Sequence, residues 1–339
     1  MMSNDLVLRI AKAPMRISFI GGGSDFKEFY SKGEIPGRVL GTTINKHVYV
    51  MASEHPTFEP FKYKFTYRKT EEVNDILDFE HPVVRATLES LSWKTPLNLA
   101  TMASLPGRSG LGSSSAFTVA LLAVLRDDKT LEDTDRETLA LDAIRVERNL
   151  LKESGGVQDQ FHAAFGGFRL YEFKDNRNVI HPRFTDLDFL NLVDQSLYLV
   201  ASGPPRSSDV HSLTLEKGLT TSEFRMNLEE MSNLALSVYS EIQNLVSPAD
   251  KIESLMFGMR HSWELKKRIG VNLSGDTEEI ISAGVSLGAE TFKLCGAGGS
   301  GFVAFMVPGS IGKKLSEHFG ENRVFQPGIS DKGVELNHL

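Results

Sequence analysis

PGRSGLGSSSAF, from Pro106 to Phe117, places three glycines and three consecutive serines directly before the apolar run AFTVALLAVL (Ala116–Leu125). Glycines adopt backbone conformations that other residues rarely reach, and they let the chain approach a ligand closely. A helix that begins near Ser114 leaves its first amide groups unpaired and directed at the loop. Free amide donors and the helix dipole attract phosphate at such a terminus. A glycine turn that leads into a serine-capped helix explains the same residues, so this stretch alone leaves both interpretations open.

The size and composition of the chain are those of a folded globular protein. At 339 residues, 41% hydrophobic and 24% charged, it is long enough for a sizeable core and two domains. No apolar run reaches the ~20 residues that span a bilayer, and residues 1–14 lack the pattern of a secretory signal. Cys295 is the single cysteine, so the chain cannot form an intramolecular disulfide. These features together predict a cytoplasmic protein. The net charge of −7 disfavours a broad nucleic-acid surface.

The spacing of apolar residues predicts a chain in which strands and helices are mixed. Strands are expected at 6–20, as a pair within 37–53, at 61–69, at 97–106, from 167, at 195–203 and on both sides of the glycines near 296. Helices are expected at 75–92, 114–125, 136–152, 222–245, 250–268 and from 276. A shift in composition across Lys174–Asp188 marks the expected boundary between two domains, 1–185 and 186–339.

The segment FKYKFTYRK (Phe61–Lys69) alternates aromatic residues with mostly basic ones. Such an alternation is typical of a platform for single-stranded nucleic acid. A strand with one buried and one solvated face produces the same pattern, and it is the favoured interpretation. No nucleic-acid partner is therefore expected.

Three glycine-rich turns each follow a predicted strand. They lie at Gly21–Gly23, Gly107–Gly112 and Gly296–Gly301, and the middle one opens a helix. Three such turns in one chain suggest loops gathered round a polyanionic ligand. The motif G-x-x-x-x-G-K-[ST] is absent, because Ser113 and not lysine follows Gly112. The H-R-D and D-F-G motifs of protein kinases are absent too.

A phosphoryl-transfer site needs more than a phosphate loop. It requires a divalent ion that bridges phosphate oxygens, a cation near the transferring group and a group that orients the acceptor hydroxyl. Magnesium takes one or two protein oxygens together with waters and phosphates. One serine hydroxyl in the loop and one carboxylate would therefore suffice.

Three motifs occur along the chain in this order: APMRISFIGGGSD (Ala13–Asp25), PGRSGLGSSSA (Pro106–Ala116) and KLCGAGGSGF (Lys293–Phe302). Each is similar to one of the three motifs of the GHMP family of small-molecule kinases, which includes galactokinase, homoserine kinase and mevalonate kinase. The order is the family's own, and the resemblance covers essentially the whole chain.

The resemblance implies an α+β fold with two domains. An N-terminal GHMP kinase domain (1–185) would carry the ATP loop. It would have the fold of domain 2 of a ribosomal small-subunit protein. A C-terminal ferredoxin-like domain (186–339) would follow it. ATP and the substrate would lie in the cleft between the two.

The resemblance also implies a set of site residues. ATP would be bound by Pro106, Gly107, Arg108, Ser109, Gly110, Leu111, Gly112, Ser113, Ser114, Ser115 and Gly298. Mg²⁺ would be bound by Ser114 and Glu147. Asp159 would be catalytic, either accepting the hydroxyl proton or orienting and polarising the hydroxyl, and Arg16 would lie close to the transferring phosphate.

The acceptor-binding residues are the least defined by the motifs. The candidates are Gly22, Gly23, Ser24, Asp25, Gln158 and Arg206. Asp25 falls where galactokinases place a sugar-binding acid, and Arg206 is a candidate bidentate ligand for a phosphate already on the sugar. The chain has three glycines where mevalonate kinases and galactokinases have Gly-Glu-His, so sugar recognition cannot be copied from galactokinase.

Within the family, the runs GGGSDFKEFY, GRVLGTTINKHVYV, HPVVRATLE and SGGVQDQFHAAFGG resemble bacterial kinases of D-glycero-D-manno-heptose 7-phosphate. This resemblance implies transfer of the ATP γ-phosphoryl group to the anomeric hydroxyl, which gives the 1,7-bisphosphate in nucleotide-activated heptose biosynthesis. Two alternatives stay open: a kinase for an unphosphorylated sugar of the fucokinase or galactokinase type, and a non-catalytic galactokinase-like sugar sensor. The expected partner is a small-molecule sugar phosphate, with no membrane contact, and the chain is expected to be a monomer or a homodimer.

Overall fold

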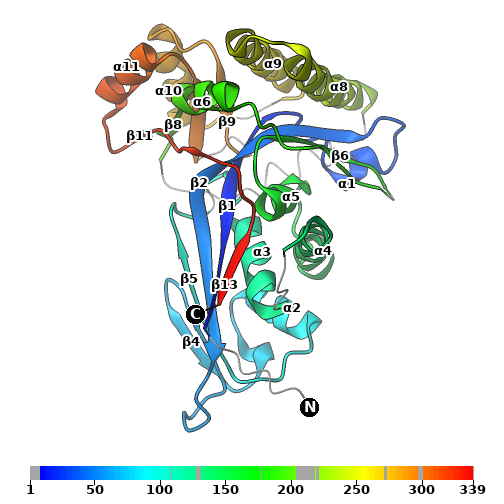
Figure 1. Ribbon diagram of the computed structural model, residues 1–339, viewed down its shortest axis with the longest axis vertical. Coiled ribbons are helices and arrows are strands. Elements are labelled where there is room, and N and C mark those ends of the chain that lie inside the picture. The colour runs from blue at the N-terminus through cyan, green and yellow to red at the C-terminus, as the bar shows by residue number, and fades with distance from the viewer. Residues whose placement is uncertain are drawn as a thin grey trace.

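The computed structural model describes residues 8–107, 109–126, 131–175, 177–203, 218, 221–270, 273–296 and 301–338. A nine-stranded sheet and a four-stranded sheet organise these residues (Figure 1). The order along the large sheet is β13-β1-β2-β5-β3-β4, with β6 and β12 also paired to β2 and β7 paired to β6. Its strands are β1 (Arg9–Ile20), β2 (Gly37–Glu54), β3 (Tyr63–Thr66), β4 (Thr70–Val73), β5 (Leu97–Ala103), β6 (Arg169–Phe173), β7 (Val179–Ile180), β12 (Ile329–Ser330) and β13 (Glu335–His338).

One face of the large sheet is covered by helices. These are α2 (Pro82–Ser90), α3 (Ser113–Arg126), α4 (Asp133–Ile144) and α5 (Gln158–Phe165). Helix α3 packs on β1 and β2 and is covered in turn by α4 and α5, so it is buried along nearly its whole length. This position explains why its sequence is apolar on every face. Three short elements, α1 (Lys27–Tyr30), η1 (Ile76–Asp78) and η2 (Arg145–Leu150), complete this half.

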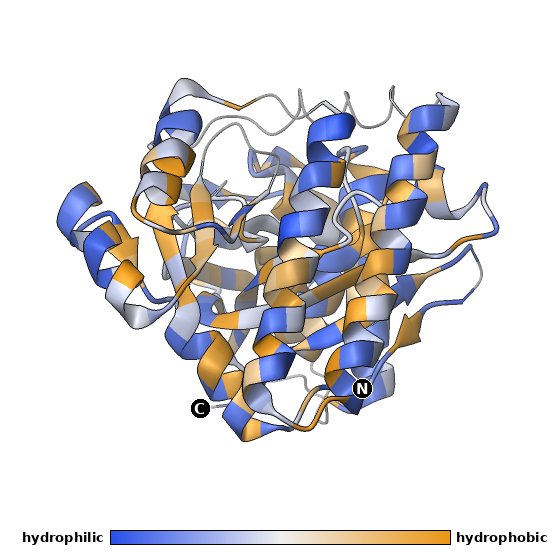
Figure 2. Cartoon of the chain, turned by 90° about the horizontal axis from the view of Figure 1, so that it is seen from above, coloured by the Kyte–Doolittle hydropathy of each residue, from blue (hydrophilic) through white to orange (hydrophobic). Residues whose placement is uncertain are grey.

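The small sheet has the order β11-β8-β10-β9 and is antiparallel throughout. Its strands are β8 (Leu197–Ala201), β9 (Phe292–Leu294), β10 (Phe302–Met306) and β11 (Val324–Phe325). The accompanying helices are α6 (Leu187–Ser196), α8 (Ser222–Asn244), α9 (Pro248–Arg268), α10 (Gly275–Ser286) and α11 (Gly309–Phe319). Helices α8 and α9 pack together above β1 and β2 (Figure 1). Seen from above, the helices carry hydrophilic and hydrophobic residues on different faces (Figure 2).

Most expected elements are present, but four of them differ in extent or continuity. The region 37–53 forms one continuous strand, β2, because it pairs with β1, β5 and β6 at successive points along its length. The expected helix 75–92 is divided into η1 and α2, and the expected helix 136–152 continues from α4 into the π-helical turn η2. Strand β3 is shorter than 61–69, but its buried Tyr63 and Phe65 and its half-buried Lys64 confirm the two-faced strand.

The division at residue 185 stays a prediction, although the structure describes how the two segments meet. The last strands of the chain return to the large sheet, where β13 pairs with β1 and β12 pairs with β2. The main core is also shared, since Val238 of α8 and Leu255 of α9 belong to the same buried cluster as β1 and α3. No helix of the described residues is long and apolar enough to cross a membrane.

The second and third glycine turns touch each other through their backbones. A side chain at Gly110 would place its Cβ 2.2 Å from the carbonyl oxygen of Cys295, and one at Gly301 would place it 2.4 Å from that of Ser109. Gly110 also has a φ of +77°, a conformation that side chains disfavour. Glycine is therefore required here for the end of the small sheet to close on the loop that opens α3.

We expect Gly110→Ala to lower the free energy of unfolding by about 1–3 kcal/mol, because the new Cβ is strained and meets backbone. Gly107→Ala is the matched control, since nothing lies within 4 Å of the Cβ it would add, and it should change stability by less than about 0.5 kcal/mol. Denaturant unfolding of both variants checks this. Equal stability of the two variants would contradict the contact.

Candidate active site

A cavity of about 260 Å³ lies where the two sheets meet. Its wall is formed by the end of β1 and the turn after it, the start of α3, η2, the loop 153–156, the start of α5, the end of α9 and β9. Segments from distant parts of the sequence therefore line one space. The first and third glycine turns contribute Gly22, Gly23 and Gly296 to it.

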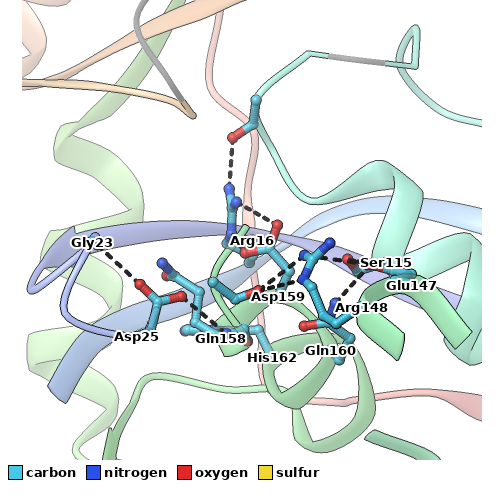
Figure 3. Close-up of polar contacts among 12 residues, drawn as sticks. Arg16, Gly23, Asp25, Ser115, Glu147, Arg148, Gln158, Asp159, Gln160 and His162 are labelled. Atoms are coloured by element: carbon cyan, nitrogen blue, oxygen red, sulfur yellow. Dashed lines mark hydrogen bonds and ion pairs between the residues drawn. The ribbon is translucent and has the colours of Figure 1, made fainter. Parts of the chain in front are cut away.

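Arg16 and Asp159 form an ion pair in this cavity (Figure 3). Arg16 Nε and Nη2 donate to the two carboxylate oxygens of Asp159, each at 2.7 Å. Its remaining nitrogen, Nη1, donates to the carbonyl oxygen of Gly110 at 2.6 Å. Burial by itself lowers the pKa of Arg16, but the Asp159 carboxylate raises it overall, so the guanidinium stays charged. The two residues expected at the reacting centre are thus in direct contact beside the glycine loop.

Glu147 lies in the π-helical turn η2, which continues α4; such turns often occur at functional sites. Its Oε2 accepts hydrogen bonds from Ser115 Oγ at 3.0 Å and from Gln160 Nε2 at 2.7 Å. Its Oε1 is buried and has no hydrogen-bond partner among the described residues. Burial raises the pKa of Glu147, because the charged carboxylate is removed from water. A buried oxygen without a partner beside serine hydroxyls fits a divalent cation, whose charge would offset that cost.

Asp25 shapes the opposite wall of the cavity (Figure 3). Its Oδ1 accepts a hydrogen bond from the backbone N–H of Gly23 at 3.0 Å, and its Oδ2 accepts one from that of Gln158 at 3.2 Å. A Cβ at Gly156 would lie 1.8 Å from Oδ2, so only glycine fits against this carboxylate. Burial raises the pKa of Asp25. Asp25 therefore holds the first glycine turn against the start of α5.

Two lysines of the C-terminal half reach the same cavity. Lys293 lies on β9 and Lys266 near the end of α9. The Nζ of Lys293 is buried and has no hydrogen-bond acceptor among the described residues. Burial and then the neighbouring Lys266 hold the pKa of Lys293 well below its ordinary value. The cavity thus contains two neighbouring lysines that were not among the expected site residues.

A second cavity, of about 630 Å³, lies at the other end of the glycine loop. Its wall is mostly apolar and aromatic and includes Tyr67, Met102 and Phe117. It shares Ser114 with the first cavity, so the start of α3 borders both. Burial lowers the pKa of His81 in its wall, which favours the neutral ring.

The structure brings many of the expected residues together, but Ser24, Ser109, Gly110, Leu111 and Gly112 line neither cavity. Ser24 does not line the cavity, because its buried hydroxyl bonds the backbone of Gly21 and Arg38 and so fixes the turn. The side chain of Leu111 packs in the hydrophobic core. Arg108, Arg206 and Gly298 lie outside the described residues.

The metal-binding expectation concerns Ser114 and Glu147. Both line the cavity, but the hydroxyl that contacts Glu147 belongs to Ser115. Within the described ranges, no group of three or more His, Cys, Asp or Glu side chains is arranged to hold a metal ion. Magnesium held largely by phosphates and waters needs no such group.

Comparison with known proteins agrees with this geometry. Residues 80–167 match the family model described as the GHMP kinases N terminal domain. The D-glycero-alpha-D-manno-heptose 7-phosphate kinase of Campylobacter jejuni is 27% identical over 87% of this chain and 88% of that protein. The bifunctional fucokinase/GDP-fucose pyrophosphorylase of Arabidopsis thaliana is 24% identical over 90% of this chain and 31% of that protein. A solved D-glycero-D-manno-heptose 1-phosphate kinase from Bacteroides thetaiotaomicron has the same fold, with a TM-score of 0.73 and 19% identity over 98% of this chain and 99% of that one.

The fold and its cavity at the meeting point of the glycine turns define an enzyme that transfers a phosphoryl group to a small molecule. Residues 80–167 resemble the N-terminal domain of GHMP kinases, and the chain is similar to known kinases along most of its length. The α+β, two-domain GHMP fold expected from the motifs is thereby confirmed.

Motif reasoning missed Lys266, Lys293 and Arg148, which line the cavity. It also missed Gln160, which donates a hydrogen bond to Glu147. Lys293 could have been noticed in the sequence, because lysine is rarely buried and this one lies in the otherwise apolar strand Phe292–Leu294. Gln160 and Arg148 are neighbours of expected residues, but polar residues on helices are usually solvated. Lys266 lies in a run of basic residues at a helix end and had no distinguishing signal.

Proposed function

We propose that this protein is an ATP-dependent sugar kinase that phosphorylates the anomeric hydroxyl of D-glycero-D-manno-heptose 7-phosphate to give the 1,7-bisphosphate. The reaction class is carried by one observation: the buried Arg16–Asp159 pair lies between the start of α3 and the Gly22–Asp25 turn. The choice of acceptor is supported by the likeness to the Campylobacter jejuni enzyme along most of both chains.

The Asp159 carboxylate holds the acceptor hydroxyl in this proposal. Arg16 fixes the carboxylate through both oxygens, so its direction is set before the acceptor binds. Arg16 also offsets charge that develops on the transferring group. Gln158, whose buried side-chain oxygen has no partner among the described residues, is placed to accept a hydrogen bond from a sugar hydroxyl.

The phosphates of ATP would lie on the amides that open α3, from Gly110 to Ser115, with the nucleoside in the 630 Å³ cavity. Glu147 Oε1 and the Ser114 hydroxyl would hold Mg²⁺. A metal ion held there would supply positive charge that offsets the charge of the phosphates. Ser115 and Gln160 then act as positioning residues, because they fix the other oxygen of Glu147.

Turnover of four acceptors with ATP and Mg²⁺ tests the substrate. We expect the highest kcat/KM for D-glycero-D-manno-heptose 7-phosphate, against fucose, galactose and mevalonate, and a product whose new phosphate couples to the anomeric carbon in NMR spectra. The likeness to the bifunctional fucokinase/GDP-fucose pyrophosphorylase of Arabidopsis thaliana favours an unphosphorylated sugar as the second candidate. Turnover of fucose or galactose without turnover of the heptose phosphate would replace the proposal by that candidate. Binding of sugar without turnover of any acceptor would indicate a sensor.

Asp159→Asn should lower kcat by about 10²- to 10⁴-fold, because the amide cannot take the hydroxyl proton. Steady-state kinetics measure this, and the unfolding temperature and ATP affinity report whether the cavity is intact. Asp331→Asn, at an exposed position outside the cavity wall, is the matched control. Full turnover by Asp159→Asn would remove this residue from the mechanism.

Glu147→Gln should separate a metal-binding role from a structural one. The Gln carbonyl can accept the bonds from Ser115 and Gln160, and the buried charge is removed, so the free energy of unfolding should stay equal or rise. The Mg²⁺ concentration for half-maximal rate should rise at least about tenfold. Glu89→Gln, exposed on α2, is the control. A loss of stability with an unchanged Mg²⁺ requirement would make Glu147 purely structural.

A further inference from the structure

Some basic side chains of the cavity have an acidic partner within the protein, and others have none among the described residues. Arg16 is paired with Asp159, and Arg148 lies 3.6 Å from Glu147 and 3.8 Å from Glu153. Lys266 and Lys293 form no ion pair with any described residue of the cavity. Lys293 is the more extreme case, because its side chain is almost completely buried.

The two lysines line the same cavity. Burial, and after it the neighbouring Lys266, lowers the pKa of Lys293. Asp25 is another carboxylate of the wall, and both of its oxygens already accept backbone hydrogen bonds. Two like charges held together away from water are unfavourable unless an anion joins them. An anionic ligand bound between the two lysines would offset this cost.

The position of Lys293 and Lys266 indicates that they face the acceptor and not the nucleotide. A point at the Cβ position of Gly22 lies 3.8 Å from Lys293 Nζ and 3.7 Å from both Gln158 Nε2 and Ser18 Oγ. Lys293 therefore faces the first glycine turn and Gln158. Figure 3 shows Gln158 and Asp25 on one side of Asp159, with Ser115 and Glu147 on the other. The start of α3, where phosphates of ATP would lie, is thus on the far side of the Arg16–Asp159 pair.

We propose that Lys293, together with Lys266, binds a phosphate monoester that the acceptor sugar already carries, away from the hydroxyl that reacts. This inference rests on the proposed function and gives it a specificity determinant. A phosphate monoester carries about two negative charges near neutral pH, which matches two ammonium groups, and lysine is a common ligand for phosphate. An acceptor without a phosphate would leave both lysines unpaired.

Lys293→Met tests the proposal with two acceptors, D-glycero-D-manno-heptose 7-phosphate and the same heptose without phosphate. The KM of the phosphorylated acceptor should rise about 10- to 100-fold, the effect of losing a hydrogen bond to a charged group. The KM for ATP and the kcat/KM of the phosphate-free heptose should change less than about threefold. Lys293→Arg should recover part of the loss, and Lys267→Met, exposed on the same helix as Lys266 and paired with Glu264, should behave as wild type.

The unfolding temperature of Lys293→Met should equal or exceed that of the wild type, because a buried unpaired charge is removed. An equal fall in kcat/KM for both acceptors, or a rise in the KM for ATP, would assign the lysine to the nucleotide and overturn the proposal. Unchanged kinetics would overturn it as well.

Calorimetric binding of mannose 6-phosphate and mannose separates this inference from the proposed function. If the wild type does not phosphorylate the heptose phosphate, the proposed function fails. Tighter binding of mannose 6-phosphate than of mannose, lost in Lys293→Met, would still support the lysine site. If the Lys293→Met variant phosphorylates the heptose phosphate with the same kcat and KM as the wild type, the lysine site alone is contradicted.

Discussion

The guanidinium of Arg16 is the interaction on which the arrangement of this cavity depends. Its three nitrogens reach the Asp159 carboxylate at the start of α5 and the Gly110 carbonyl in the glycine loop. Its backbone N–H donates to the carbonyl oxygen of Leu111 at 2.9 Å. One residue of β1 therefore joins the loop that opens α3 to the helix that carries the carboxylate. Because a guanidinium keeps its charge and its planar geometry when buried, lysine could not make the same set of contacts.

Glycine provides the second constraint, at the two positions where backbones meet. Gly110 lies against Cys295 and Gly296, and Gly156 lies against the carboxylate of Asp25. Any side chain at either position would separate segments that line the cavity. The sheets thus place the loops in reach of one another, and the glycines allow them to close to contact distance.

Sequence patterns predicted the parts of this arrangement that are local. The glycine loop and the helix Ser113–Arg126 follow from turn chemistry and an apolar run. The first turn of that helix was less predictable: Ser115, and not Ser114, contacts Glu147, because a shift of one residue turns a side chain by roughly 100° around the helix. Lys293 and Lys266 come from different elements of the C-terminal half, so only the tertiary structure reveals that they meet. The continuity of β2 likewise depends on the three strands that pair with it.

In the proposed function, Asp159 and Arg16 divide the cavity between a nucleotide side and an acceptor side. A crystal structure with a non-hydrolysable ATP analogue, Mg²⁺ and heptose 7-phosphate would test this division. We expect the terminal phosphate at the start of α3 and the anomeric hydroxyl about 2.6–3.2 Å from an Asp159 oxygen. We also expect the sugar phosphate beside Lys293. A sugar bound in the 630 Å³ cavity, or beyond reach of Asp159, would show that the pair does not divide the cavity in this way.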